Sequence, residues 1–275
     1  MSAAATPTPI RNQVETALAL RSAGQLQEAL DVLTTPSDDI ADFYTIRGDI
    51  QLALGRFEEA AGSYFTVVTS EPDNTFANYN LAVCLHRLGR WSEACQAFQK
   101  VLAVDSHRDD ARLGFGDCLL HLDRAEEALT NFDSCWSDAA RLRVLFGKAV
   151  ALQLLRRFDE ARAAYERLLQ WDPKCEEALT NLIALEIGAG ELDEARRSAM
   201  RLLDMSPHST VALQCLAAVA LENREYEAVV RYCGRIVEQA PECKEAWHNL
   251  RFASGRVMSG LSASEPSAGA GSGRK

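Results

Sequence analysis

The chain has 275 residues, of which 47% are apolar, and carries a formal net charge of −10 at pH 7. This is the composition of a folded protein, and no apolar run approaches the length of about 18 residues that a membrane span needs. The acidic balance counts against nucleic acid and against an anionic membrane as partners, because both require a basic face. Basic or neutral protein segments are the easier partners.

The first nine residues are small residues, Thr and Pro after the initial Met. Such a segment buries too little apolar surface to offset chain entropy, so we predict that residues 1–9 are disordered. The segment lacks the basic and apolar regions of a secretory signal. The chain also has eight cysteines but no Cys-x-x-Cys pair. We therefore expect reduced, buried thiols and a cytoplasmic location.

From about residue 10 to residue 255 the pair Glu-Ala recurs at a nearly constant interval. Its seven copies begin at Glu28, Glu59, Glu93, Glu127, Glu160, Glu194 and Glu227, with steps of 31, 34, 34, 33, 34 and 33 residues. A period near 34 residues that fills the chain predicts a solenoid of stacked helical hairpins rather than a single globular core.

Each period has the pattern of two helices. In the repeat that spans residues 75–109, Ala77, Leu81 and Leu85 lie on one helical face, Gly89 ends that helix, and a second helix begins near Trp91. Large aromatic side chains recur in the second helices and are expected to fill the space between repeats, at Phe98, Phe132 and Tyr165. Prolines 34 residues apart should stop the second helices of the later repeats, at Pro173, Pro207 and Pro241.

This order of residues resembles the tetratricopeptide repeat over about residues 10–255. The resemblance implies an all-α fold, a right-handed superhelical solenoid of about seven helix-turn-helix repeats. The fourth repeat departs from the family pattern, because Asp123 and Ala125 stand where Gly and an aromatic residue are usual. Trp247 and Phe252 suggest a C-terminal capping helix on the last repeat. The tail, residues 256–275, is dominated by Ser, Gly and Ala, and we predict that it is disordered.

In that family, fixed positions of the first helix of each repeat face a concave groove. Carried over to this chain, these positions give the candidate partner-binding residues Asp42, Asp49, Phe76, Tyr79, Asn80, Asp110, Asp117, Phe146 and Asn181. The aromatic side chains would bury apolar surface of a partner, the asparagines would bond its backbone, and the aspartates would favour nearby Lys or Arg. The alternative is that the aspartates are a solvated face and the aromatic residues are packing between helices.

We find no motif for catalysis, phosphate binding or metal binding, so we expect no enzymatic activity, no cofactor and no metal. His86 and His121 lie on first helices of adjacent repeats and could approach each other, but two histidines alone are not a metal site. The predicted function is a protein–protein interaction scaffold or adaptor that binds a peptide or helix of a partner. The alternatives are a self-assembling, head-to-tail homo-oligomer and an accessory repeat subunit of a separate enzyme, such as a glycosyltransferase.

Overall fold

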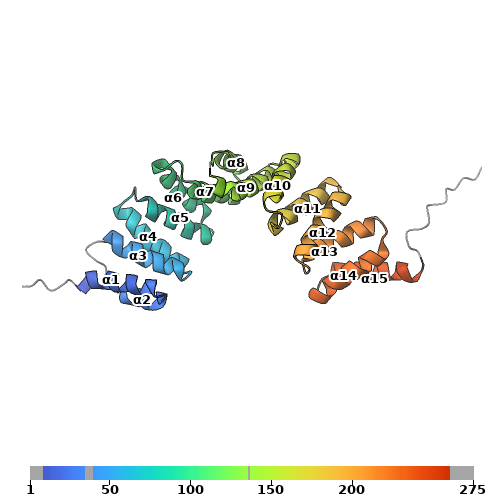
Figure 1. Ribbon diagram of the computed structural model, residues 1–275, viewed down its shortest axis with the longest axis horizontal. Coiled ribbons are helices and arrows are strands. Elements are labelled where there is room, and N and C mark those ends of the chain that lie inside the picture. The colour runs from blue at the N-terminus through green and yellow to red at the C-terminus, as the bar shows by residue number, and fades with distance from the viewer. Residues whose placement is uncertain (1–8, 35–39, 136, 261–275) are drawn as a thin grey trace, which may run out of the picture. The chain divides into compact units, whose positions relative to one another are not determined.

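The computed structural model describes residues 9–34, 40–135 and 137–260. In these ranges α-helices and turns alternate and there is no strand, as Figure 1 shows. The helices are α1 (Pro9–Ser22), α2 (Leu26–Val32), α3 (Ile40–Ala53), α4 (Phe57–Ser70), α5 (Thr75–Arg87), α6 (Trp91–Val104), α7 (Asp109–His121), α8 (Ala125–Asp133), η1 (Asp138–Ala140), α9 (Arg141–Leu154), α10 (Phe158–Trp171), α11 (Glu176–Ala189), α12 (Leu192–Met205), α13 (Thr210–Glu222), α14 (Tyr226–Gln239) and α15 (Lys244–Met258). Most of the two segments predicted to be disordered lies outside the described residues.

The chain divides into two compact units, Met1–Arg157 and Phe158–Lys275. In the first unit, helices pair as α1 with α2, α3 with α4, α5 with α6 and α7 with α8, and each pair packs on the next. Helix α9 packs on α7 and α8. In the second unit α10 packs on α11, the pairs α11 with α12 and α13 with α14 follow, and α15 packs on α14. The boundary falls inside the fifth sequence repeat.

A residue in the left-handed backbone conformation ends the first helix of each repeat. The φ angle is between 57° and 79° at Gly24, Gly55, Gly89, Asp123, Arg156, Gly190 and Arg224. This conformation is easy for glycine and strained for residues with a Cβ. The predicted break at Gly89 is therefore confirmed. The departure at Asp123 does not change the turn, because the aspartate takes the same backbone conformation as the glycines.

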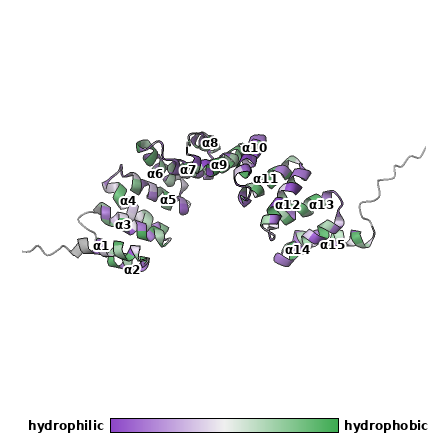
Figure 2. Cartoon of the chain, viewed as in Figure 1, coloured by the Kyte–Doolittle hydropathy of each residue, from purple (hydrophilic) through white to green (hydrophobic). Residues whose placement is uncertain are grey.

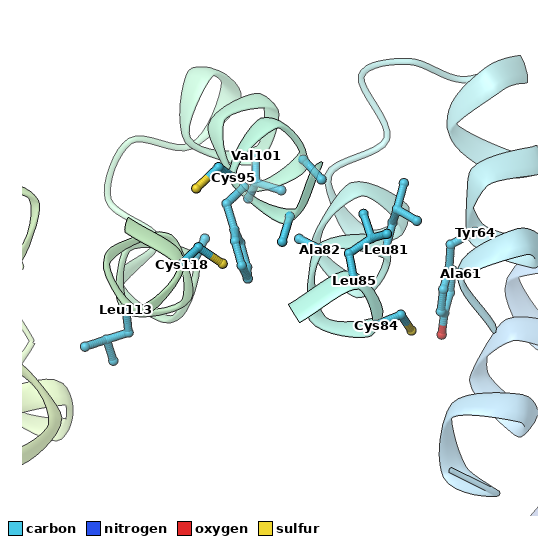
Figure 3. Packing of buried hydrophobic residues seen from close by; sticks show 14 of the residues in the cluster. Ala61, Tyr64, Leu81, Ala82, Cys84, Leu85, Cys95, Val101, Leu113 and Cys118 are labelled. Carbon is cyan, nitrogen blue, oxygen red and sulfur yellow. The ribbon is translucent and has the colours of Figure 1, made fainter. Parts of the chain in front are cut away.

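The core is built from aromatic side chains of second helices that enter the space beside the following first helix. Phe98, Phe132 and Tyr165 are at most 2% exposed, which confirms that they fill space between helices. The Phe132 ring lies against Gly147 of α9 so closely that a Cβ there would be 2.5 Å from its Cζ atom. Figure 3 shows the same arrangement earlier in the chain, where Tyr64 of α4 faces Cys84 of α5.

The ends of the second helices follow the prolines. Helices α10, α12 and α14 each stop two residues before Pro173, Pro207 and Pro241, as predicted. Helix α15 packs along α14 with Ala246 and Ala253, which are buried, while Trp247 and Phe252 stay 40% and 42% exposed. Figure 2 shows hydrophobic and hydrophilic residues mixed along the helices. None of the helices in the described ranges is long and apolar enough to cross a membrane.

Candidate functional site

The predicted partner-binding residues lie on first helices in both units. Asp42 and Asp49 are on α3, Phe76, Tyr79 and Asn80 on α5, Asp110 and Asp117 on α7, and Phe146 on α9, all in the first unit. Asn181 is on α11 in the second unit. In the first unit, α5, α7 and α9 bring several of these side chains together.

Tyr79 is held in place by a cation and by another aromatic ring. The Arg108 guanidinium carbon lies 4.2 Å from the centre of the Tyr79 ring, and the ring meets Phe98 edge-on at 6.0 Å between centroids. Arg108 in turn donates from Nε to Oδ1 of Asp110 at 2.9 Å. Burial raises the pKa of Tyr79, and the Asp110 carboxylate raises this pKa further. Phe76 lies one helical turn before Tyr79 and is 47% exposed, so the two rings share one face.

Arg143 of α9 adds a second positive charge near Tyr79. Its side chain is 61% exposed and approaches the Asp117 carboxylate at 3.7 Å. Burial raises the pKa of Asp117, while the positive charges of Arg143 and His121 oppose that change. Arg143 also lowers the pKa of Tyr79. The structure thus brings Tyr79 and Asp117 within electrostatic reach of one exposed guanidinium.

Three aromatic side chains continue this surface toward the ends of α5 and α7. The Trp91 ring stacks on His121 at 4.0 Å and 8° between planes, and His86 meets Trp91 edge-on at 4.9 Å. The two histidine rings are 6.2 Å apart, which confirms that they approach each other. Burial, followed by the charge of His121, lowers the pKa of His86. Across the described residues no group of three or more His, Cys, Asp or Glu is placed to hold a metal ion.

Two of the predicted residues bond to buried tyrosines of their own unit. The Asp49 carboxylate accepts from the Tyr64 hydroxyl at 2.7 Å and pairs with Arg21 at 3.0 Å. Asn181 donates from Nδ2 to the Tyr165 hydroxyl at 3.0 Å. These two side chains therefore support the packing of the buried tyrosines. Of the remaining residues, Asp42 is exposed near the start of α3, while Asn80 and Phe146 are half-buried.

Arg108, Arg143 and Trp91 belong to this surface but were absent from the predicted set. Arg108 is a turn residue just before α7. The family positions used for the prediction lie within the helices, so they did not include it. Arg143 occupies the same repeat position as Asp42 and Asp110, with the opposite charge. A change of charge sign at one repeat position is a usable signal, because neighbouring repeats can then form ion pairs.

Comparisons with known proteins agree with the helical hairpins. Two family models, both described as tetratricopeptide repeat, match residues 47–107 in one case and residues 89–134 and 152–203 in the other. A tetratricopeptide repeat protein from Parabacteroides merdae is similar at 17% identity with a TM-score of 0.65, covering 90% of this chain and 99% of that chain. The C-terminal part of a TPR repeat-containing protein from Cytophaga hutchinsonii is similar at 15% identity with a TM-score of 0.68, covering 86% and 99%.

A third solved structure is YrrB, described as a TPR protein with an unusual peptide-binding site. It is similar at 16% identity with a TM-score of 0.55, and the match covers 70% of this chain and 99% of that chain. At these identities the likeness to the three structures concerns the fold alone.

Proposed function

The chain belongs to the tetratricopeptide repeat family, and on that basis we propose that it is a non-enzymatic scaffold or adaptor that binds a peptide or helix of another protein. Repeats of this family generally mediate protein–protein interaction, and YrrB has a peptide-binding site. We place the binding surface on the first helices α5, α7 and α9 of the first unit.

The observation that carries this proposal is the exposed aromatic and guanidinium surface around Tyr79. Phe76 offers exposed apolar area, and Arg143 offers an exposed cation within the same cluster. Tyr79 is held by Arg108 and Phe98, so little side-chain freedom is lost when a partner docks. Tyr and Arg are the residue types that most often dominate binding energy at interfaces.

The charges of the cluster set which partners it favours. Predicted aspartates form ion pairs within the chain, Asp49 with Arg21, Asp110 with Arg108 and Asp117 with Arg143. We propose that these pairs act on association rate and specificity, as charges at the rim of an interface do, rather than on affinity. The affinity then comes from an apolar side chain of the partner against Phe76 and Tyr79, with Asn80 and Phe146 beside them.

We propose a reducing, cytoplasmic environment for this protein. All eight cysteines are free thiols, and Cys84, Cys95, Cys118, Cys215 and Cys233 are buried. Burial raises the pKa of Cys84 to about 11, so its reactive thiolate form is rare at neutral pH.

Sedimentation at several protein concentrations separates a monomeric adaptor from head-to-tail self-assembly, because only the latter gains mass with concentration.

Photo-cross-linking in cells tests the proposed surface. Benzoylphenylalanine replaces Phe76 in one variant and Val104, which is 60% exposed on α6, in the control. We expect a discrete protein adduct from position 76 that the control does not give, and whose yield falls when Tyr79→Ala is added. The cross-linked segment is then titrated against Tyr79→Ala and Tyr79→Phe, and we expect the alanine to weaken binding about fivefold or more. Equal adducts from both positions would remove the support for this surface.

A further inference from the structure

A hollow of about 430 Å³ lies between the second helices α4 and α6, over the back of α5. Its floor is formed by buried side chains, among them Ala61 of α4 and Leu81 and Leu85 of α5, which Figure 3 labels. No residue of the surface around Tyr79 lines it. The volume falls within the range of about 300–1,000 Å³ that is typical of ligand pockets.

The wall on α4 combines an exposed aromatic ring with a glycine. Phe65 lines the hollow and is 62% exposed. Gly62, one turn earlier, also lines it, and a Cβ there would meet no heavy atom within 4 Å. A glycine inside a helix costs about 0.5–1 kcal/mol relative to alanine. Neither a positive φ nor close packing requires glycine at this position, and its effect is to leave the wall open beside Phe65.

A polar acceptor lies in the apolar floor. Asn78 of α5 lines the hollow and is 2% exposed. Its Nδ2 donates to the carbonyl oxygens of Pro72 at 2.8 Å and Asn74 at 2.9 Å, which fixes the orientation of the amide. Its Oδ1 is buried and has no hydrogen-bond partner among the described residues. A buried acceptor without a donor is costly, so an occupant is favoured whose N–H or O–H group reaches Oδ1 when the side chains that cover this atom shift.

The charges at the two ends of the hollow differ. At one end Arg90 pairs with Glu58 of α4 at 3.2 Å and with Glu93 of α6 at 2.7 Å, so one of the two carboxylate charges stays unbalanced there. At the other end Lys100 of α6 lines the hollow, and no carboxylate of the described part of the chain forms an ion pair with it. The end of the hollow at Lys100 is therefore its positive end, and this end suits an acidic group.

We propose that this hollow is a second protein-binding site, whose occupant is a partner segment that presents a tryptophan or tyrosine side chain beside an acidic residue. The aromatic ring fills the space above Gly62 and packs on Phe65. Its indole N–H or phenol O–H supplies the donor for Asn78, and the neighbouring carboxylate pairs with Lys100. Aromatic residues with one polar atom are common at interfaces because they bury apolar area and still satisfy a buried polar group.

The test uses the full chain labelled with ¹⁵N and the dipeptide probe N-acetyl-Trp-Glu-amide at millimolar concentrations. The matched probes are N-acetyl-Trp-Lys-amide, which reverses the charge, and N-acetyl-Ala-Glu-amide, which removes the ring. We expect saturable amide shifts centred on Gly62, Phe65, Asn78 and Lys100. Trp-Glu should bind about threefold or more tightly than Trp-Lys, as expected for one exposed ion pair, and Ala-Glu should cause no saturable shift.

Variants connect the signal to the hollow. Gly62→Leu fills the space and should abolish binding, whereas Gly62→Ala should change affinity less than twofold. Gly234→Leu is the matched control, because Gly234 is also a helical glycine, and no heavy atom lies within 4 Å of the position that a Cβ would take there. Lys100→Gln should remove the preference for Trp-Glu over Trp-Lys. This variant tests whether the probe binds in the hollow even if Gly62→Leu alters folding.

Tyr79→Ala should leave binding of the dipeptide probe to the hollow unchanged. The proposal for the hollow and the proposal for the surface around Tyr79 can therefore be refuted independently. The proposal is overturned if no saturable shifts occur at the four residues. It is also overturned if Gly62→Leu binds the probe like the parent while keeping its helical circular dichroism, or if Trp-Lys binds as well as Trp-Glu.

Discussion

Replacing Gly147 by alanine should destabilise the first unit, although alanine is the better helix former. Gly147 is in α9, where a Cβ would lie 2.5 Å from Cζ, 2.8 Å from Cε2 and 2.9 Å from Cε1 of Phe132. Carbon atoms at rest are about 3.5–4 Å apart, so the ring or the helix must move by about 1 Å. The ring cannot easily yield, because Phe132 is fully buried and the same tip of its ring, Cζ and Cε1, also lies against Gly116 of α7.

The magnitude follows from two opposing effects. Overpacking of a tight core costs about 1–3 kcal/mol, and the gain in helix propensity returns about 0.5–1 kcal/mol. The expected net loss is about 1–2 kcal/mol, which lowers the melting temperature by roughly 2–8 °C for a unit of this size. The matched control is Gly62→Ala in α4, where nothing lies within 4 Å of the added Cβ. That variant should melt slightly above the parent.

The assay is thermal unfolding followed by far-ultraviolet circular dichroism, with Gly147→Ala, Gly62→Ala and the parent at equal concentration. A second measurement places Gly147→Ala in a Phe132→Leu background, where the smaller side chain leaves room for the methyl group. The alanine should then cost less than it does beside Phe132, because the two sites are in contact and their effects do not add. If Gly147→Ala melts at or above the parent temperature, the close packing of Phe132 on α9 is refuted.

Four further substitutions test other parts of the structure. Arg224→Gly should raise stability by about 0.5–1 kcal/mol in urea unfolding, because φ is 59° there and glycine removes the strain; unchanged stability would argue against the left-handed turn. Glu186 is 4% exposed and burial raises its pKa, so ionisation of this carboxyl group opposes folding. The protonated carboxyl group contributes fully to stability below the unfolded pKa, and this contribution is lost as pH rises through the folded pKa. Glu186→Gln should therefore stabilise the chain relative to the parent increasingly as pH rises from about 4.5, and a difference that does not vary with pH would contradict this. Ala94→Leu and Ala161→Leu, at two fully buried alanines, should each cost about 1–3 kcal/mol in the same unfolding assay, whereas unchanged melting would show that these positions have room.

The repeat period could be read from the sequence because it is a local property of each hairpin. The spacing of the Glu-Ala pairs, the glycine turns and the prolines fixes where helices begin and end, within about one turn of helix. The same spacing identified the buried aromatic residues, since a position that is buried in one repeat is buried in the next. Even the fourth repeat keeps the turn at Asp123, because the packing of the flanking helices imposes the left-handed conformation on a residue other than glycine.

The roles of the predicted site residues depended on tertiary contacts. The family positions identify Asp49 and Asn181 as candidates for binding a partner, but their hydrogen bonds to Tyr64 and Tyr165 become visible only in the structure. Arg108 and Arg143 join the surface around Tyr79 through contacts with residues of neighbouring helices. Such contacts join residues of different helices, and their geometry depends on rotamers and on how helices cross, which periodicity does not specify.

The sequence by itself thus determined the helical hairpins, their turns and their buried faces, because helix formation and burial follow from the spacing of apolar residues, glycines and prolines along each repeat. Only the tertiary structure decided which carboxylates pair with an arginine and that the Arg108 guanidinium lies over the Tyr79 ring. It also decided that the absence of a side chain at Gly62 leaves a hollow above Asn78. These features arise where side chains of different helices meet, and a difference of one methyl group or one rotamer decides whether the space is filled, paired or open.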